Sequence, residues 1–388
     1  MKGLPMRLAS FKYVSLIVWS GIVSFTAITH AESQASVALP QDEARVDDER
    51  KLHWYDIQQL GVEGKAWQET KAPFDRLPAK AEGVVRGPVW GLSRHSAGMC
   101  VRFRTDATSI HAHWTLTSGN LAMPHMPATG VSGLDLYVKD GIGTWRWLAV
   151  GRPGAQENTA TLVSGIPTGE RDYMLYLPLY NGVSQVELGI PQDATLKTLP
   201  RESERAKPVV FWGTSITQGG CASRTGMVHT AILGRRLDRP VVNLGFSGNG
   251  KMEPEMAEFL AEIDAAVYVI DCLPNMTADE VTERVERLVE IVRKKHPHTP
   301  IVLAEDRTYS DAFLIASKRQ RNDTSRTALK SAFDRMQATG VSGLHYLPGE
   351  TQLGDDNLGT VDGSHPTDLG FMRMADVFEP VLRPLLAQ

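Results

Sequence analysis

The C-terminal half of the chain alternates short, mainly apolar runs with longer amphipathic stretches. The apolar runs lie at residues 209–212, 241–244, 266–270, 301–303 and 344–347. Because a strand without polar alternation is buried on both faces, these runs predict a parallel sheet with helices above and below it. The stretches between and after them predict helices at residues 225–237, 253–263, 277–296, 323–338 and 368–386. The pattern therefore indicates a doubly wound, flavodoxin-like α/β domain with a five-stranded sheet at residues 207–388.

Residues 51–200 follow a different pattern, in which apolar and polar residues alternate. The alternating runs lie at residues 99–104, 109–115, 134–139, 145–150, 173–177 and 183–190. Alternation with a period of two and turn residues after each run is typical of an antiparallel β-sandwich. The polar segment at residues 201–207 (RESERAK) separates this predicted β-sandwich domain from the α/β domain.

The first 50 residues show neither pattern. Three basic residues precede an apolar stretch at residues 13–28, which ends in Thr-His-Ala at residues 29–31. This order predicts a secretory signal peptide at residues 1–31. An uncleaved anchor is the alternative, but the stretch is shorter than the ~20 apolar residues of a membrane span. We therefore expect an exported protein, periplasmic or secreted, without stable membrane insertion after cleavage, and a flexible leader at residues 32–50.

Charge and cysteine content narrow the classes of function. The formal net charge is -4, and no run of lysine and arginine is dense enough to hold a phosphate backbone, which argues against a nucleic-acid partner. The three cysteines, Cys100, Cys221 and Cys272, lack the paired spacing of a zinc site. In an oxidising compartment Cys221 and Cys272 are a candidate disulfide; three buried thiols are the alternative.

A serine follows the first strand of the predicted parallel sheet. Residues 213–220 read GTSITQGG, so that Ser215 leaves the strand at a glycine-flanked turn where backbone N–H groups converge. The loops after the second and third strands contain Gly248 and Asn275. Because the carboxyl ends of parallel strands meet at one edge of a sheet, we expect the Gly248 N–H and the Asn275 amide beside Ser215. Together with the Ser215 N–H they would form an oxyanion hole.

An acid and a base precede the last predicted helix. Residues 362–366 read DGSHP, and Asp362 can accept a hydrogen bond from His365 Nδ1 while Nε2 takes the proton of Ser215. Each motif alone is common in turns and helix caps, but four blocks in this order on successive strand ends are not expected by chance. The sequence thus predicts a Ser215-His365-Asp362 triad that needs no metal or other cofactor.

These blocks resemble those of the SGNH hydrolase superfamily, the GDSL lipases and esterases, over residues 208–386. The nucleophile block departs from the usual Gly-Asp-Ser, because residues 213–215 read Gly-Thr-Ser. Since the acid of the triad comes from Asp362, the departure argues against a typical lipase subgroup and not against the triad. Residues 133–137 read GLDLY and resemble the Gly-x-Asp-Leu-Tyr signature of a subgroup with an N-terminal β domain.

The resemblance implies an SGNH hydrolase fold and a serine esterase acting on short acyl esters. Acetyl groups on sugars are the expected substrates, so the expected partner is a small-molecule or carbohydrate ester. Two alternatives stay open: an acyltransferase that uses the same acyl-enzyme, and a non-catalytic protein that binds carbohydrate through its β domain. Arg224 and Asp306, which follow the first and fourth strands, are candidate substrate-binding residues, with a surface or domain-interface role as the alternative.

Overall fold

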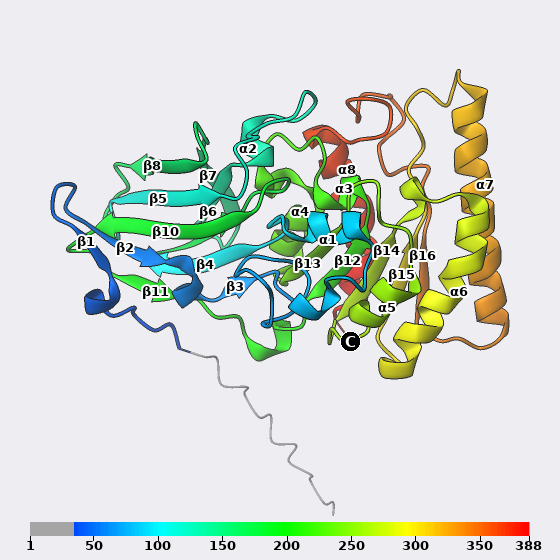
Figure 1. The fold of residues 1–388 in the computed structure, drawn as a ribbon, viewed down its shortest axis with the longest axis horizontal. Helices are drawn as coiled ribbons and strands as arrows, with labels where there is room; N and C mark the ends of the chain where they lie inside the picture. The colour runs from blue at the N-terminus through cyan, green and yellow to red at the C-terminus, as the bar shows by residue number, and fades with distance from the viewer. Residues whose placement is uncertain (1–34, 388) are drawn as a thin grey trace, which may run out of the picture.

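The structure, a computed structural model, describes residues 35–387. Two antiparallel sheets pack together in the N-terminal half, and a parallel sheet flanked by helices forms the C-terminal half (Figure 1). The predicted signal peptide lies wholly outside the described residues, as does the start of the predicted leader. Within residues 35–387, no helix has the length and apolar character that a membrane crossing requires.

The N-terminal half is an antiparallel β-sandwich, as predicted. Its strands are β1 (Arg45–Asp47), β2 (Leu52–Asp56), β3 (Val62–Glu63), β4 (Cys100–Thr105), β5 (Ser109–Leu116), β6 (Leu134–Lys139), β7 (Trp145–Gly151), β8 (Glu157–Ser164), β9 (Arg171–Tyr176), β10 (Val183–Pro191) and β11 (Leu196–Thr198). One sheet has the order β1-β2-β10-β5-β8; the other has β11-β4-β9-β6-β7, with β3 paired to β4. Alternate side chains of both sheets, such as Trp114 and Leu175, meet in one apolar core.

The prediction of a flexible leader at residues 32–50 is wrong for the second half of that segment. Strand β1 pairs antiparallel with β2, and Arg45 forms an ion pair with Glu187 on β10 at 2.6 Å and lies over the ring of Trp54. Because β1 is an edge strand, its side chains are exposed or only partly buried. The strand therefore carries no apolar alternation, which is why the pattern did not reveal it.

The C-terminal half is the predicted doubly wound domain. Its strands are β12 (Val209–Gly213), β13 (Val241–Gly245), β14 (Val267–Asp271), β15 (Ile301–Ala304) and β16 (Leu344–Leu347). They pair in parallel in the order β13-β12-β14-β15-β16, the flavodoxin-like order that was expected. The sequence prediction of this fold is confirmed.

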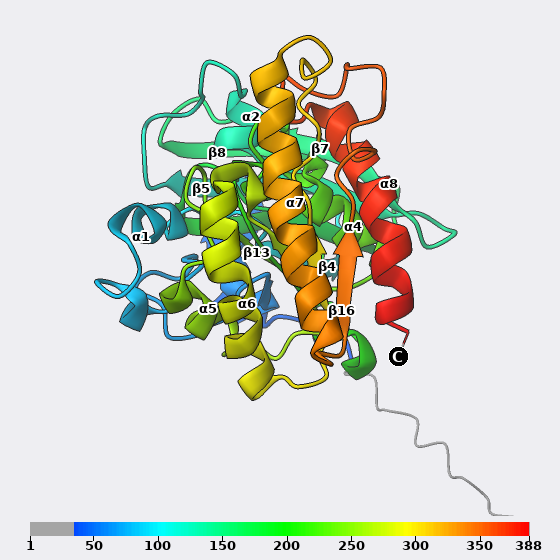
Figure 2. The ribbon, with the colours of Figure 1, turned by 90° about the vertical axis from the view of Figure 1, so that its right-hand side faces the viewer.

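Helices cover both faces of the parallel sheet. They are α3 (Ser215–Gln218), α4 (His229–Leu237), α5 (Pro254–Leu260), α6 (Ala278–Lys295), α7 (Ala316–Ala338) and α8 (Asp368–Leu385). Helices α5, α6 and α7 pack on one face, and α4 and α8 on the other (Figure 2). Helix α6 begins at a capping box, in which Thr277 and Glu280 exchange side-chain and backbone hydrogen bonds.

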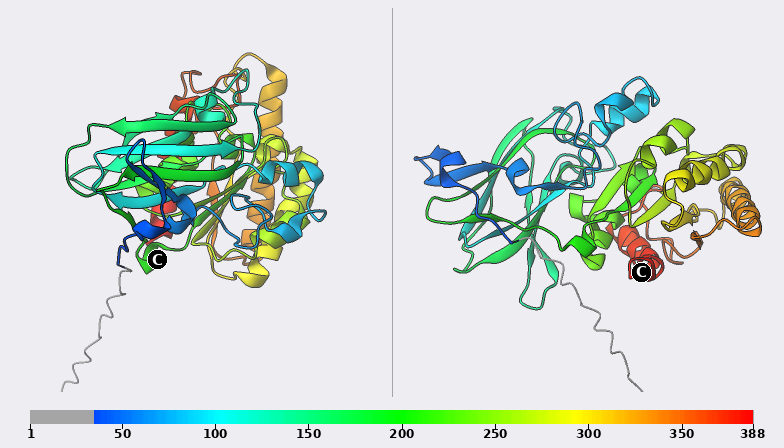
Figure 3. Two further views of the ribbon diagram at one scale, coloured as in Figure 1. Left: turned by 60° about the vertical axis from the view of Figure 1, so that its left-hand side comes forward. Right: turned by 90° about the horizontal axis from the view of Figure 1, so that it is seen from below.

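A segment of the N-terminal domain packs on the α/β domain. It contains helix α1 (Gly87–Ser93), and its buried side chains Leu77, Val85 and Val89 lie in the same apolar cluster as Trp212 of β12. Figure 3 shows α1 beside the helices of the α/β domain and away from the strands of the sandwich. The N-terminal domain is therefore a sandwich with an extension that covers part of the parallel sheet.

Candidate active site

The three predicted triad residues form a hydrogen-bonded relay at the carboxyl edge of the parallel sheet. Ser215 Oγ lies 2.7 Å from His365 Nε2, and His365 Nδ1 lies 2.8 Å from Asp362 Oδ2. Ser215 is 8% exposed. A hydroxyl, an imidazole and a carboxylate in this order can form an activated nucleophile, because the imidazole can take the hydroxyl proton.

A tight turn between β12 and α3 presents Ser215. Thr214 caps the helix, since its Oγ1 accepts a hydrogen bond from the Ile216 N–H. At Gly213 a Cβ atom would lie 2.0 Å from Thr217 Oγ1, so only glycine allows the helix to begin this close to the strand. Ser215 is the first residue of α3, and its N–H therefore has no acceptor within the helix.

The loop before α8 holds the acid and the base in a fixed geometry. Asp362 Oδ1 accepts hydrogen bonds from the backbone N–H groups of Ser364, at 3.0 Å, and His365, at 2.8 Å. Burial acts to raise the pKa of Asp362, but the hydrogen bonds from His365 and Ser364 outweigh it and hold the pKa below its usual value. Asp362 is therefore ionised at neutral pH and can orient the His365 ring.

Two further donors belong to the neighbouring loops. Gly248 has a φ of +69°, and a Cβ atom there would meet nothing within 4 Å, so its backbone borders open space. Asn275 Oδ1 accepts a hydrogen bond from the Gly250 N–H at 3.3 Å, which leaves the Asn275 NH₂ group available as a donor. Both residues follow strands adjacent to β12, as an oxyanion hole beside Ser215 requires.

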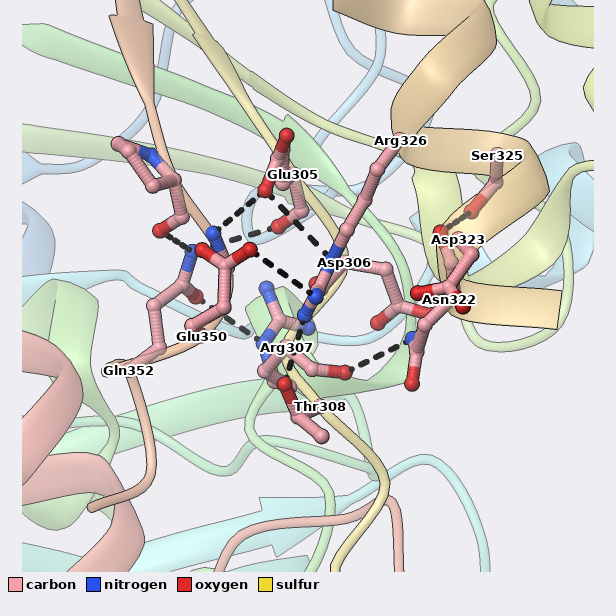
Figure 4. Close-up of polar contacts among 12 residues, drawn as sticks. Glu305, Asp306, Arg307, Thr308, Asn322, Asp323, Ser325, Arg326, Glu350 and Gln352 are labelled. Carbon is pink, nitrogen blue, oxygen red and sulfur yellow. Dashed lines mark hydrogen bonds and ion pairs between the residues drawn. The ribbon is translucent and has the colours of Figure 1, made fainter. Parts of the chain in front are cut away.

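A buried ion pair that the sequence did not reveal lies behind the nucleophile. Thr217 Oγ1 donates to Asp271 Oδ2 at 3.0 Å, and Arg307 donates to the other carboxylate oxygen. Arg307 is 1% exposed and also donates to Gln352 in the loop after β16 (Figure 4). The pair thus connects the nucleophile helix to two loops at the carboxyl edge of the sheet.

The N-terminal domain contributes side chains directly around the site. Tyr180 OH donates to the Ser215 carbonyl at 3.0 Å, and the Gln218 amide of α3 lies 3.1 Å from His95 Nδ1. The ring of His125, in a sandwich loop, lies with its centroid 6.3 Å from that of His365. The carboxyl edge of the parallel sheet is therefore enclosed partly by the other domain.

The Gly-x-Asp-Leu-Tyr motif forms one of the contacts between the domains. Asp135, on β6, is fully buried and accepts hydrogen bonds from Arg224 Nη1 at 2.7 Å, the Gly226 N–H at 2.8 Å and Trp147 Nε1 at 2.8 Å. Arg224 also donates to Tyr137 OH. Arg224 thus lies at the domain interface, the alternative role given for it, and a part in substrate binding stays a prediction. The hydrophobic pattern of the sequence does not predict how the sandwich packs against the α/β domain, so it could not indicate this interface.

Replacing Asp135 by alanine is expected to lower the free energy of unfolding by about 3–5 kcal/mol, because Arg224 would keep its partly buried charge without a partner. Urea denaturation followed by circular dichroism measures the change. Asp264→Ala is the matched control, since it removes the Lys207–Asp264 pair, in which both side chains are more than half exposed, and should leave stability nearly unchanged. Equal stabilities of the two variants would contradict the role of Asp135.

Asp306 is also a structural residue. It is 2% exposed, its carboxylate accepts from Asn322 Nδ2 at 3.3 Å, and its carbonyl accepts two hydrogen bonds from Arg326 (Figure 4). Burial raises the pKa of Asp306 to about 6, although Arg307 opposes the shift. These contacts join α7 to the loop after β15, so the substrate-binding assignment of Asp306 is not supported.

The candidate disulfide does not form. Cys221 and Cys272 are free, buried thiols, as is Cys100. Cys272 packs in the apolar core with Trp212 on one face of the sheet, whereas Cys221 lies in the turn after α3, near enough to Asp362 for that carboxylate to help raise the pKa of the thiol. Because the two side chains lie in different environments, the alternative of three buried thiols is correct.

Comparison with known proteins agrees with this architecture. A family model described as GDSL-like lipase/acylhydrolase matches residues 206–383, and one described as the N-terminus of SGNH-hydrolase-type esterases, with the GxDLY motif, matches residues 52–196. No curated protein matches the sequence. A crystal structure from Bacteroides ovatus described as a GDSL-like lipase is 34% identical, with a TM-score of 0.82, and the match covers 87% of this chain and 98% of that one.

Two more distant structures share the fold. The salicylyl-acyltransferase SsfX3 from a tetracycline biosynthetic pathway is 18% identical, with a TM-score of 0.68, over 91% of this chain and 98% of that chain. A family two carbohydrate esterase from Clostridium thermocellum, in complex with cellohexaose, is 15% identical, with a TM-score of 0.56, over 75% of this chain and 93% of that chain. Taken with the extent of the Bacteroides ovatus match, the two domain matches show that the chain belongs to the GDSL-like lipase/acylhydrolase family of SGNH hydrolases, in the group with an N-terminal GxDLY domain.

Proposed function

We propose that this protein is a serine esterase that hydrolyses short acyl esters, with acetyl esters of carbohydrates as its substrate class. The observation that carries the proposal is the relay from Ser215 Oγ through His365 to Asp362, with contacts of 2.7 and 2.8 Å. Ser215 attacks the ester carbonyl, His365 takes its proton and returns it to the departing alcohol, and water then releases the acyl group. Asp362 stabilises the imidazolium form of His365.

The proposal of a short acyl group rests on the crowding around the nucleophile. At Gly220 an added Cβ atom would lie 2.9 Å from Tyr180 OH and 3.3 Å from His365 Cδ2. Ser215 itself is 8% exposed. A small acyl group such as acetyl fits beside such a nucleophile more readily than a long chain. The carbohydrate half of the proposal is suggested by the family two carbohydrate esterase of the same fold.

Hydrolysis of p-nitrophenyl acetate by the purified protein tests the esterase proposal. A fluorophosphonate should block the activity and label Ser215, as located by mass spectrometry of the peptides. A protein that neither hydrolyses the ester nor reacts with the fluorophosphonate would contradict the proposal and favour the non-catalytic carbohydrate-binding alternative.

An acyltransferase remains the second candidate, because the same fold occurs in the salicylyl-acyltransferase. An alcohol that intercepts the acyl-enzyme in place of water would give a new ester. Analysis of the products formed from p-nitrophenyl acetate and an added sugar distinguishes the two: free acetate indicates hydrolysis, and acetylated sugar indicates transfer.

Replacing Asn275 by alanine is expected to lower kcat by about 10²–10³-fold, the usual effect of losing one oxyanion donor. KM should change little, because the donor acts mainly on the charge that develops in the transition state. Asn275→Asp is the matched variant: it keeps an acceptor for the Gly250 N–H but lacks the NH₂ donor. Both variants should lose activity, and a wild-type kcat in either would exclude Asn275 from the oxyanion hole.

A further inference from the structure

Arg76 lies in the extension of the N-terminal domain that contains α1. It is a buried cation without an acidic partner. It is 2% exposed, and no carboxylate of residues 35–387 forms an ion pair with it. Burial lowers the pKa of its guanidinium to about 9, so the charge is present at neutral pH. Burying a charge this way is costly, which calls for a compensating set of contacts.

Those contacts are backbone carbonyls of both domains. Arg76 Nε donates to the His95 carbonyl at 2.9 Å and Nη2 to the Leu92 carbonyl at 2.6 Å, both in its own segment. Nη1 donates to the carbonyls of Asn243, at 3.0 Å, and Gly245, at 2.6 Å. One guanidinium therefore joins the N-terminal extension to the last residues of β13.

The loop that follows β13 contains Gly248. Directly after the two carbonyls bound by Arg76 comes Phe246, whose ring lies 5.0 Å from the guanidinium carbon. The next N–H, that of Ser247, donates to Gln218 of the nucleophile helix at 3.1 Å. At Gly248 itself an added Cβ atom would meet nothing within 4 Å, so that side of the loop borders open space. The direction of its N–H consequently depends on how the base of the loop is anchored.

We propose that Arg76 is a positioning residue of the oxyanion hole, which fixes the end of β13 so that the Gly248 N–H points at the developing oxyanion. The inference rests on the proposed esterase function and gives the N-terminal domain a part in catalysis. Arg76 acts through the backbone and does not contact the substrate.

The test compares Arg76→Met with Arg94→Met. Arg94 lies in the same segment, but its charge contacts Asp75 and the ring of Trp90, so its removal should leave kcat unchanged. For Arg76→Met we expect kcat on p-nitrophenyl acetate, per titrated active site, to fall by about 10- to 100-fold, less than for the loss of a donor. KM should stay within about threefold, and phenylboronic acid, which forms a tetrahedral adduct with serine, should bind more weakly by the same factor as kcat falls.

A purely structural role would lower the concentration of titratable sites and leave kcat per site and boronate affinity intact, and that result overturns the inference. If Arg76→Met does not fold, Arg76→Lys decides, because an ammonium group can reach only part of the four carbonyls. A loss of kcat per site of about 3- to 10-fold in that variant is expected, and a wild-type value rejects the role. An inactive wild-type protein would instead reject the esterase proposal itself.

Discussion

Replacing Ser215 by alanine is expected to lower kcat on p-nitrophenyl acetate by about 10⁶-fold, the scale of loss when the nucleophile of a serine triad is removed. The reason is that the hydroxyl 2.7 Å from His365 Nε2 is the only group in the relay able to form the acyl-enzyme. The measurement is the initial rate of p-nitrophenolate release, with the folded state checked by circular dichroism.

Ser331→Ala is the matched control, since Ser331 is exposed on α7 and should leave the rate unchanged. Retention of wild-type turnover by Ser215→Ala would show that the hydrolysis arises elsewhere on the protein. In that case neither the relay nor the proposed oxyanion donors would explain the activity.

Replacing Asp362 by asparagine should lower kcat by about 10⁴-fold while leaving the fold intact. An amide keeps the size of the carboxylate, but it has no negative charge to stabilise the imidazolium form of His365, and it can turn its NH₂ group towards Nδ1. It also favours the tautomer in which Nε2 carries a proton and cannot act as the base for Ser215. Steady-state kinetics should therefore show a loss in kcat with a small change in KM.

Asp355→Asn provides the control for this second variant, because Asp355 is an exposed carboxylate of the same loop. Its kcat should equal that of the wild type. If both asparagine variants were equally impaired, the loss would reflect the general charge of the loop, and the specific contact between Asp362 and His365 would not account for it.

Local signals in the sequence were sufficient to find the strand-end residues of the site. Ser215, Gly248, Asn275 and the Asp362 to His365 block each follow a strand or precede a helix, and the topology of a parallel sheet brings such positions to one edge. No local sequence pattern indicated which side chains of the N-terminal domain lie around the site. Arg76 is a single arginine in an irregular segment, and the role proposed for it depends on how two domains dock, which the hydrophobic pattern does not encode.

Helix α7 shows why part of the fold was missed. The pattern predicted a helix at residues 323–338, whereas the helix begins at Ala316. Residues 316–321 are exposed or only partly buried, and the first buried side chains are polar. Of these, Asn322 and Arg326 bind the loop after β15, including Asp306 (Figure 4). A helix whose buried face is polar has no apolar stripe, so a search for hydrophobic periodicity shortens it.

Two apolar clusters of the fold each contain side chains from both domains. Met174 and Leu179 of the sandwich share a cluster with Ile216 and Phe371, while Leu77 and Val89 share one with Trp212. Separating the chain at the polar linker would thus uncover a large hydrophobic area on each fragment. We therefore expect the two sequence modules to unfold as a single cooperative unit, so that the α/β half should not fold as an excised fragment.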